Sequence, residues 1–372
     1  MLNGFELPNL APMEISGRLP RLSARLADLE CDGLLVTNLT NIRYLTGFSG
    51  SAGMLLVTPE DALIVSDGRY RDELAEQVEA ASAPVRIEIG SLAAQWEFVE
   101  QAARGIPRLG LEAHTVTWAE QQRLAGDLPA GTRLVAVANA VETLRVIKDD
   151  GELARIECAA DVADVAFAQV KELLTQAPTE LEFAMALDSE MRRRGADSVA
   201  FESIVASGPN GALPHAQPSS RRVEPAELIV IDFGATIDGY RSDMTRTVSV
   251  GDPRPDQHDV IEAVLSAQRA GVRALRAGVT GGEVDAVCRD SLASAGLGDA
   301  FLHGTGHGVG LDVHEAPSVS QNSTDILEAG AVVTVEPGAY LYPNGGARIE
   351  DTLVVTDSGS RVLTKSTKDY VL

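Results

Sequence analysis

The chain is poor in cysteine and contains no long apolar run. Its three cysteines, Cys31, Cys158 and Cys288, lie far apart and form no Cys-x-x-Cys pair, so we expect reduced thiols and no disulfide framework. No stretch of about 18 apolar residues occurs, and we therefore expect no membrane-spanning helix. Residues 1–16 have neither a basic start nor an apolar core. This argues against a secretory leader and favours a cytoplasmic location.

Basic residues are also scarce compared with acidic ones. The chain has 31 Lys and Arg against 54 Asp and Glu, which gives a formal net charge of −23. Nucleic acids and anionic membranes are bound through clustered Lys and Arg, so we expect neither as a partner. The 372 residues, 45% of them hydrophobic, are enough for sizeable cores and favour two domains.

Short apolar strands alternate with amphipathic helices between residues 17 and 147. Leucines at helical spacing predict a helix over 18–30, and apolar runs predict strands such as 33–38 and 62–66. This alternation predicts a mixed α/β domain over 17–147 that follows a loose tail at 1–16.

A charged stretch at 148–152 marks the expected start of a second domain, residues 148–372. Thr179 with Glu182, and Thr280 with Glu283, have the spacing of capping boxes that begin helices. The segments that we expect in this domain are a helix over 151–174, a helix from 179, strands over 201–250, helices over 256–276 and 280–295, and then strands and turns.

Residues 303–315 read HGTGHGVGLDVHE and contain three histidines, His303, His307 and His314. The interleaved glycines argue against a helix, and the chain has no HExxH, so we reject a helical zinc site. The segment also lacks the GxxxxGK[ST] pattern of a phosphate-binding loop. The glycines instead allow the backbone to approach a ligand closely.

Four acidic residues fall in contexts typical of strands. Asp232 and Asp243 flank an Asp-Gly turn at 238–239, so a hairpin would place them side by side. Glu336 follows an apolar strand, and Glu350 lies in an alternating one. A strand glutamate usually faces solvent, and an aspartate among apolar residues is costly to bury unless it is paired or metal-bound. Together with a histidine, the four acids could hold two divalent cations and activate a water, which predicts a metal-dependent hydrolase.

The order Asp232, Asp243, His307, Glu336, Glu350, with the segment HxxGHGxGLxxHE, resembles the pita-bread metallopeptidases. That group includes methionine aminopeptidase, aminopeptidase P, prolidase and the non-metal creatinase. TNLTNIRYLTGFSGSAG and SDGRY, early in the chain, resemble the creatinase-type N-terminal domain, which methionine aminopeptidases generally lack. The resemblance implies a creatinase-like α/β domain followed by a pita-bread catalytic domain, in which helices flank an antiparallel sheet. It also favours the proline-directed branch.

By this resemblance Asp232 would bind one cation, His307 and Glu336 the other, and Asp243 and Glu350 would bridge the two. Glu336 would in addition accept or shuttle a proton. Four carboxylates and one imidazole form an oxygen-rich set that suits Mn²⁺ best, while Co²⁺, Zn²⁺ or Fe²⁺ could also bind.

Further residues match positions that contact substrate in this family. His215 resembles a histidine near the scissile amide, and His314 one that binds the carbonyl oxygen or gem-diolate. His303, Tyr340 and Arg348 resemble residues of the pocket for the proline ring. For Arg348 a second role, pairing with the carboxylate cluster, is equally open. The alternative for each histidine is a purely structural role, as a hydrogen-bonded core residue or as a surface residue.

The resemblance implies an exopeptidase that hydrolyses the Xaa-Pro bond at the N-terminus of peptides. We favour Xaa-Pro aminopeptidase, whose substrates are peptides with proline at the second position. The alternative is prolidase, which acts on Xaa-Pro dipeptides. More remote alternatives are a non-catalytic peptide-binding module and a metal-free C–N hydrolase like creatinase. A homodimer is implied as well.

Overall fold

The computed structural model of the chain describes residues 8–372, which divide into two compact units. One unit consists of Pro12–Arg145. The other consists of Val146–Leu372 together with residues 8–11.

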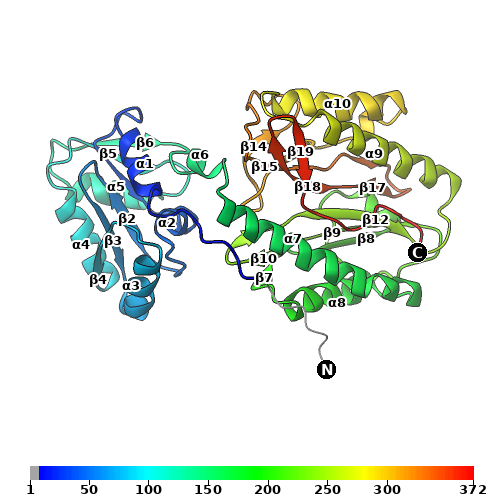
Figure 1. Cartoon of the computed structure of the whole chain (residues 1–372), viewed down its shortest axis with the longest axis horizontal. Coiled ribbons are helices and arrows are strands. Elements are labelled where there is room, and N and C mark those ends of the chain that lie inside the picture. Colours follow the sequence, from blue (N-terminus) through cyan, green and yellow to red (C-terminus); the bar gives the residue numbers. More distant parts are fainter. Residues whose placement is uncertain (1–7) are drawn as a thin grey trace. The chain divides into compact units, whose positions relative to one another are not determined.

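The N-terminal unit is a mixed α/β domain built on one six-stranded sheet, as the sequence predicted (Figure 1). Strand β1 pairs antiparallel with β2 and parallel with β5. The strands, in sheet order, are β4 (Arg86–Ile89), β3 (Ala62–Ser66), β2 (Met54–Val57), β1 (Gly33–Val36), β5 (Arg108–Glu112) and β6 (Arg133–Val137). The helices are α1 (Arg18–Arg25), α2 (Leu39–Thr46), α3 (Arg71–Ala80), α4 (Leu92–Ala102), α5 (Trp118–Asp127) and α6 (Glu142–Arg145).

Two local predictions in this unit need correction. Helix α1 ends at Arg25, several residues before the predicted end at 30. The sequence analysis placed no helix at 39–46, where α2 forms. Asn38 caps α2 by accepting a hydrogen bond from the backbone N–H of Thr40, and Gly47 ends it with φ 80°. Helix α2 has only eight residues, which is a short window for a periodic pattern, and its caps add to its sequence signal.

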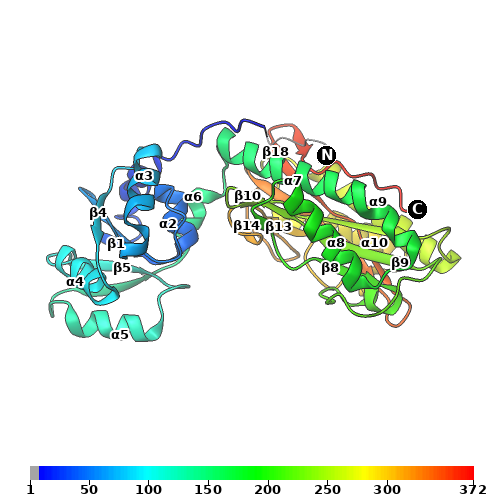
Figure 2. The same cartoon turned by 90° about the horizontal axis from the view of Figure 1, so that it is seen from below.

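The catalytic unit has helices on both sides of its strands, as the resemblance implied (Figure 1). In the view from below, α7 and α8 lie in front of the sheets (Figure 2). The helices are α7 (Asp150–Val170), α8 (Glu180–Arg193), α9 (Pro255–Ala274) and α10 (Gly281–Ser294). The strands are β7 (Ser198–Val199), β8 (Ile204–Ser207), β9 (Leu228–Phe233), β10 (Ala235–Ile237), β11 (Tyr240–Arg241), β12 (Met244–Ser249), β13 (Gly306–Gly308), β14 (Glu315–Val319), β15 (Val332–Val335), β16 (Gly338–Tyr340), β17 (Gly346–Arg348), β18 (Asp351–Thr356) and β19 (Gly359–Val362).

The helix starts follow the sequence signals closely. Both predicted capping boxes are present, Thr179 with Glu182 at α8 and Thr280 with Glu283 at α10. The helix expected over 151–174 is α-helical only as far as Val170 and continues as a 3₁₀ turn over Lys171–Gln176.

The predicted Asp-Gly hairpin is present, but its strands are interrupted. The turn at 238–239 joins the short strands β10 and β11, and both turn residues have positive φ. Beyond them the pairing continues in a second sheet, where β12 lies antiparallel to β9 with Thr245 opposite Asp232. The break falls at Gly234, where a Cβ would lie 1.9 Å from the carbonyl oxygen of Ser242. The hairpin therefore brings the two aspartates together through four strands.

Two separate cores support the strands of this unit. In one, α7 and α8 pack on β8–β12 through side chains such as Phe167, Phe183 and Phe233. In the other, α9 and α10 cover strands of the C-terminal half through residues such as Val264, with Val333 beneath them. Most of these side chains are fully buried, so each core stabilises its own set of strands.

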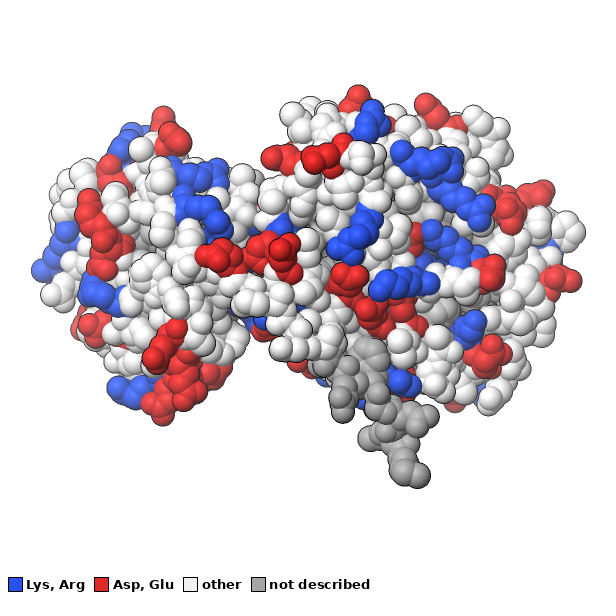
Figure 3. All heavy atoms as spheres, viewed as in Figure 1, with Lys and Arg blue, Asp and Glu red and all other residues white. Residues whose placement is uncertain are grey.

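The three cysteines are unpaired and buried, as expected. Burial raises the pKa of the Cys288 thiol to about 12, which leaves it protonated and unreactive. Among the described residues no helix has the length and apolarity required to span a bilayer. On the face of the catalytic unit shown in Figure 3, basic and acidic side chains are interspersed.

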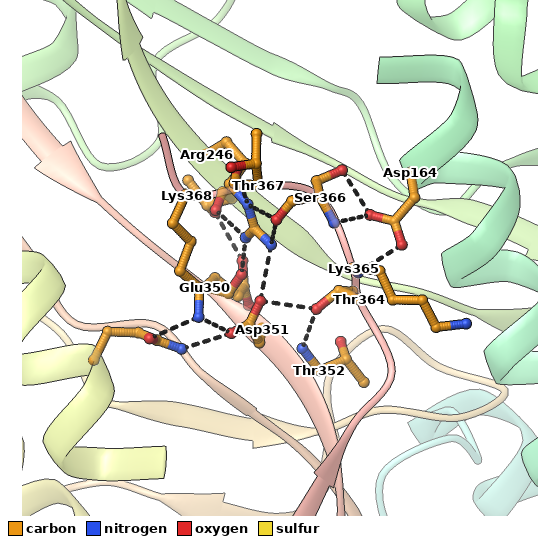
Figure 4. A network of polar contacts seen from close by, with 12 residues as sticks. Asp164, Arg246, Glu350, Asp351, Thr352, Thr364, Lys365, Ser366, Thr367 and Lys368 are labelled. Carbon is orange, nitrogen blue, oxygen red and sulfur yellow. Dashed lines mark hydrogen bonds and ion pairs between the residues drawn. The ribbon is translucent and has the colours of Figure 1, made fainter. Parts of the chain in front are cut away.

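A buried polar network ties the C-terminal segment to β12 and β18 (Figure 4). Asp351 accepts hydrogen bonds from Arg246 Nη2 at 2.9 Å, Thr364 Oγ1 at 3.0 Å and Gln268 Nε2 at 2.9 Å, and it also pairs with Lys368. Arg246 in turn donates to the backbone carbonyls of Thr245, Ser366 and the residue before Asp351. The network therefore holds the backbone of neighbouring strands by charge-assisted bonds.

We predict that Asp351→Asn destabilises the protein by about 3–5 kcal/mol, because it leaves Arg246 buried without its charge partner. The measurement is the free energy of unfolding from urea titration of chelated protein. Glu157→Gln is the control, because Glu157 forms an exposed pair with Arg361 that should contribute less than about 1 kcal/mol. Equal stabilities of the two variants would show that the buried pair does not support the fold.

Candidate metal centre

The five residues predicted to bind metal line a single cavity of about 490 Å³ in the catalytic unit. Ligand atoms of Asp232, Asp243 and Glu350 lie within 4.8 Å of one another, and so do those of His307, Glu336 and Glu350. Asp243 also forms such a group with His307 and a further histidine, His314. Residues spread over more than a hundred positions of the chain therefore meet in a space that could hold two cations.

Each of these residues is held at a strand or at a strand end. Asp232 lies in β9 and Asp243 directly precedes β12, which is paired with β9. Glu336 directly follows β15, and its backbone N–H donates to the carbonyl of Thr305 at 2.7 Å. Glu350 occupies the break between β17 and β18, where its N–H donates to the carbonyl of Thr245. The backbone of the site is therefore largely set by strand pairing.

His307 lies in the short strand β13, which confirms that its glycine-rich surroundings are not helical. A Cβ at either flanking glycine would lie within about 2.2 Å of a backbone oxygen, so only glycine fits there. Nδ1 of His307 donates to the carbonyl of Gly308 at 3.0 Å. Its Nε2 faces Glu336 Oε1, 3.3 Å away, and Asp243 Oδ2, 3.6 Å away, on the side of the cavity. The imidazole is thus oriented as a metal ligand.

Two buried carboxylate oxygens at this site, Asp232 Oδ1 and Glu350 Oε1, have no hydrogen-bond partner among the described residues. The second oxygen of each is satisfied, by Arg348 at 2.7 Å and by the hydroxyl of Thr245 at 2.7 Å. An unpaired buried carboxylate oxygen is costly unless a cation or water completes it. The donor set therefore fits divalent cations.

The carboxyl groups strongly perturb one another. Burial and the negative charges of Glu350, Asp232 and Glu336 raise the pKa of Asp243 well above its usual range. Burial and the charges of Glu336 and Asp232 raise the pKa of Glu350 in the same way. Without cations the site therefore retains protons that ordinary carboxyl groups would lose.

The pKa of Glu336, unlike those of Asp243 and Glu350, is lowered, because Glu336 is paired with His307. Burial acts to raise the pKa of Glu336, but the hydrogen bond and charge of His307 outweigh it, and the pKa is lowered. Burial acts to lower the pKa of His307, but Glu336 outweighs that effect, and this pKa is raised. Glu336 is therefore an ionised carboxylate at neutral pH and can accept a proton.

A chain of hydrogen bonds runs from the cavity wall to Asp232. The hydroxyl of Tyr340 lies 2.8 Å from His303 Nε2 and accepts from Arg348 Nη1 at 2.8 Å. Arg348 then donates to Asp232, and its side chain is only 4% exposed. Its contacts fit both of the expected roles, since it lines the cavity beside the hydroxyl of Tyr340 and also pairs with the carboxylate of Asp232. Tyr340 is not among the described residues that line the cavity, so it acts from behind its wall.

His215 and His314 also line the cavity, together with His303. The rings of His307 and His314 meet edge to face with centroids 4.3 Å apart. Burial, and then the neighbouring charge of His307, lower the pKa of His314, so it is a neutral imidazole near pH 7 and can donate one hydrogen bond. The ten predicted site residues, of which Glu336 has two assigned roles, therefore all lie at this one site or directly behind it.

The sequence analysis missed several residues of the site. Thr245 donates to Glu350 and accepts from Arg348 Nε at 3.1 Å, and Thr334 accepts from the backbone N–H of His307 at 3.1 Å. Thr245 follows Asp243 by two positions, so strand alternation could have suggested that both face the cavity. The cavity is also lined by Phe201, Glu202, Ile204, Gln217, Ser318 and Ser320, which no motif marked.

Comparison with known families agrees with this geometry. Residues 154–357 match metallopeptidase family M24, and residues 18–147 match the creatinase/prolidase N-terminal domain. The first match alone covers more than half of the chain.

Individual proteins are similar over almost the whole length. The chain is 41% identical to an uncharacterized peptidase, YqhT, of Bacillus subtilis, over 95% of this chain and 99% of that one. Its structure resembles an Xaa-Pro dipeptidase from Bacillus anthracis (TM-score 0.91, 37% identity, 95% and 99% covered). It also resembles an X-Pro aminopeptidase from Thermotoga maritima (TM-score 0.85, 33% identity, 95% and 100% covered). The chain therefore belongs to metallopeptidase family M24 and carries the creatinase/prolidase N-terminal domain.

Proposed function

We propose that the protein is an Xaa-Pro aminopeptidase that uses two divalent cations, with Mn²⁺ the preferred metal. The observation that carries the proposal is the pair of unsatisfied buried oxygens, Asp232 Oδ1 and Glu350 Oε1, in the same cavity as the imidazole of His307. Carboxylates dominate this set, and oxygen-rich sites suit Mn²⁺. The relatives support the substrate class, since they include proteins named Xaa-Pro dipeptidase and X-Pro aminopeptidase.

Bound cations would supply a hydroxide nucleophile at neutral pH and polarise the scissile carbonyl. The protein's own side chains would transfer the proton, stabilise the developing negative charge and position the substrate. Glu336 would take up the proton of the nucleophilic water and return it to the leaving amine. His314, a neutral donor, hydrogen-bonds the carbonyl oxygen as it gains negative charge. His215 contacts the substrate near the scissile amide.

Proline specificity follows from what the Xaa-Pro bond lacks. Its amide has no N–H, so a site cannot recognise that donor and must recognise the ring instead. His303 provides a flat face beside Phe301, with ring centroids 5.2 Å apart, and Tyr340 and Arg348 hold its other side. His303 and Arg348, which line the cavity, form our proposed proline pocket together with Tyr340, which supports them from behind the wall.

The choice between aminopeptidase and dipeptidase is tested with a small peptide set. We predict that the Mn²⁺-loaded protein cleaves Xaa-Pro-Pro tripeptides at least as fast, in kcat/KM, as the matching Xaa-Pro dipeptides. Xaa-Ala-Pro peptides are the control and should be cleaved more than about tenfold more slowly, because alanine leaves the ring pocket unfilled. Cleavage of dipeptides alone would assign the protein as a prolidase, and cleavage of neither would reject the Xaa-Pro proposal.

We predict that Asp243→Asn lowers kcat at least about a thousandfold, because a bridging carboxylate is lost from the proposed metal centre. Titration calorimetry should show about two Mn²⁺ equivalents for the unaltered protein and fewer for the variant. Asp238→Asn, at the nearby hairpin turn outside the cavity, is the control and should retain activity and metal binding. Unchanged turnover in Asp243→Asn would refute the assigned centre.

The raised pKa values of Asp243 and Glu350 predict an unusual pH dependence of stability. In chelated protein these groups bind protons more tightly when folded than when unfolded, so their contribution to stability falls as pH rises from about 4 toward the raised pKa values. The melting temperature of chelated protein should therefore fall more steeply over this range than that of Asp243→Asn. If the melting temperatures of the two proteins fell equally steeply with pH, the carboxyl groups would not repel one another.

A further inference from the structure

His215 is placed at the cavity by a loop, residues 208–219, that follows β8, the strand whose first residue, Ile204, pairs with Asp232. Its side chain is exposed, and it forms no hydrogen bond within the part of the chain that the structure describes. The position of the imidazole therefore depends on how the backbone of the loop is held.

One buried carboxylate, that of Glu180, binds both ends of this loop. Its Oε1 accepts from the N–H and the hydroxyl of Ser207, both at 2.7 Å. Its Oε2 accepts from the N–H of Ser219 at 3.0 Å and from its hydroxyl at 2.6 Å. The amide of Asn210 reaches both oxygens, at 3.1 and 3.0 Å. Glu180 is 0% exposed, so the whole acceptor capacity of this ion serves the loop.

The backbone of the helix that carries Glu180 also binds the end of the loop. Glu180 is the first residue of α8, and its N–H donates to the carbonyl of Arg221 at 2.9 Å. The next N–H, of Leu181, donates to the carbonyl of Ser219 at 3.1 Å. The N-terminus of a helix also stabilises a negative charge, so the ion is well placed without a direct cationic partner. Helix and carboxylate therefore bind the same segment.

Contacts on either side of His215 complete its placement. The carbonyl of Pro214 accepts from Arg348 Nη1 at 3.3 Å, which joins the loop to the proposed proline pocket. Ala216 is buried in a small cluster with Ile204 and Ala206 of β8. These contacts hold the backbone on both sides of His215, and Glu180 holds the two ends of the loop that carries it.

We propose that Glu180 is a positioning residue that holds this loop closed and so presents His215 to the substrate. The proposal rests on the substrate contact of His215 in the proposed function. Among the described residues Glu180 forms no hydrogen bond or ion pair with a proposed metal ligand, and its side-chain partners are Ser207 at the end of β8 and Asn210 and Ser219 in the loop. Its loss should therefore weaken substrate turnover without weakening metal binding.

The first test is Glu180→Gln, which keeps the size of the side chain but sets an NH₂ group against donors that need an acceptor. We expect kcat/KM for an Xaa-Pro-Pro peptide to fall about tenfold, while the Mn²⁺ dissociation constant stays within about twofold of the original. Hydrogen exchange of the amides in 208–219 should become faster. Loss of Mn²⁺ binding in step with activity, or unchanged exchange in the loop, would overturn the proposal.

The second test is a double-mutant cycle with His215→Ala, which should lower kcat/KM about a hundredfold. If Glu180 acts through His215, adding Glu180→Gln to this variant should change kcat/KM by less than about twofold. A further tenfold loss would mean that Glu180 acts by another route. Full activity of His215→Ala would reject the role proposed for this histidine, while the exchange measurement would still report whether Glu180 holds the loop.

Two other variants keep the tests informative. Asn210→Ala removes two of the bonds without altering the buried charge, and it should reproduce a smaller part of each effect if Glu180→Gln does not fold. Glu182→Gln, in the exposed capping box of the same helix, is the matched control and should leave kcat/KM and loop exchange unchanged. An equal effect of Glu182→Gln would assign the result to α8 as a whole.

Discussion

Mutual repulsion among four carboxyl groups, two of them buried and two half-buried, is the constraint on which the catalytic unit depends. Asp232, Asp243, Glu336 and Glu350 share one cavity, and two of them have pKa values raised well above the usual range by burial and by one another. Within residues 8–372 the guanidinium that pairs with the set is that of Arg348. A cluster like this resists assembly, because each charge would be more stable in water. The fold has to hold it together until cations neutralise it.

The fold does so by placing the ligands at positions where strand pairing prevents the backbone from moving the carboxyl groups apart. They lie within or directly beside paired strands that are backed by two independent cores. Thr245 shows how one position serves several demands, since its carbonyl accepts from the N–H of Glu350 while its hydroxyl donates to that side chain. Behind this pair, Arg246 and Asp351 bind the same two strands to the C-terminal segment. The polar network thus supports the centre through the main chain.

The sequence predicted most of the site because its chemistry is local to recognisable segments. Asp-Gly turns, capping boxes and a glycine-rich run of histidines each report a short-range constraint, and the family resemblance supplied the pairing between them. The contribution of Thr245 could not be read in the same way. A threonine that bridges a carboxylate and an arginine leaves only the weak signal of strand alternation, because its partners lie about a hundred residues away. Helix α2 was missed for a different reason, since it is only eight residues long.

Strand pairing holds the proposed metal ligands, whereas a loop holds His215, and this difference indicates which parts of the site can vary among relatives. The proposed metal ligands are held by strand ladders, in which a shift of one residue would turn every side chain to the other face. His215 is held by a loop whose closure depends on a single carboxylate at a helix start. Loops tolerate changes of length and composition better than strands do. One metal centre can therefore serve peptidases of different substrate length, because the loops that meet the substrate can change while the ladders that hold the cations cannot.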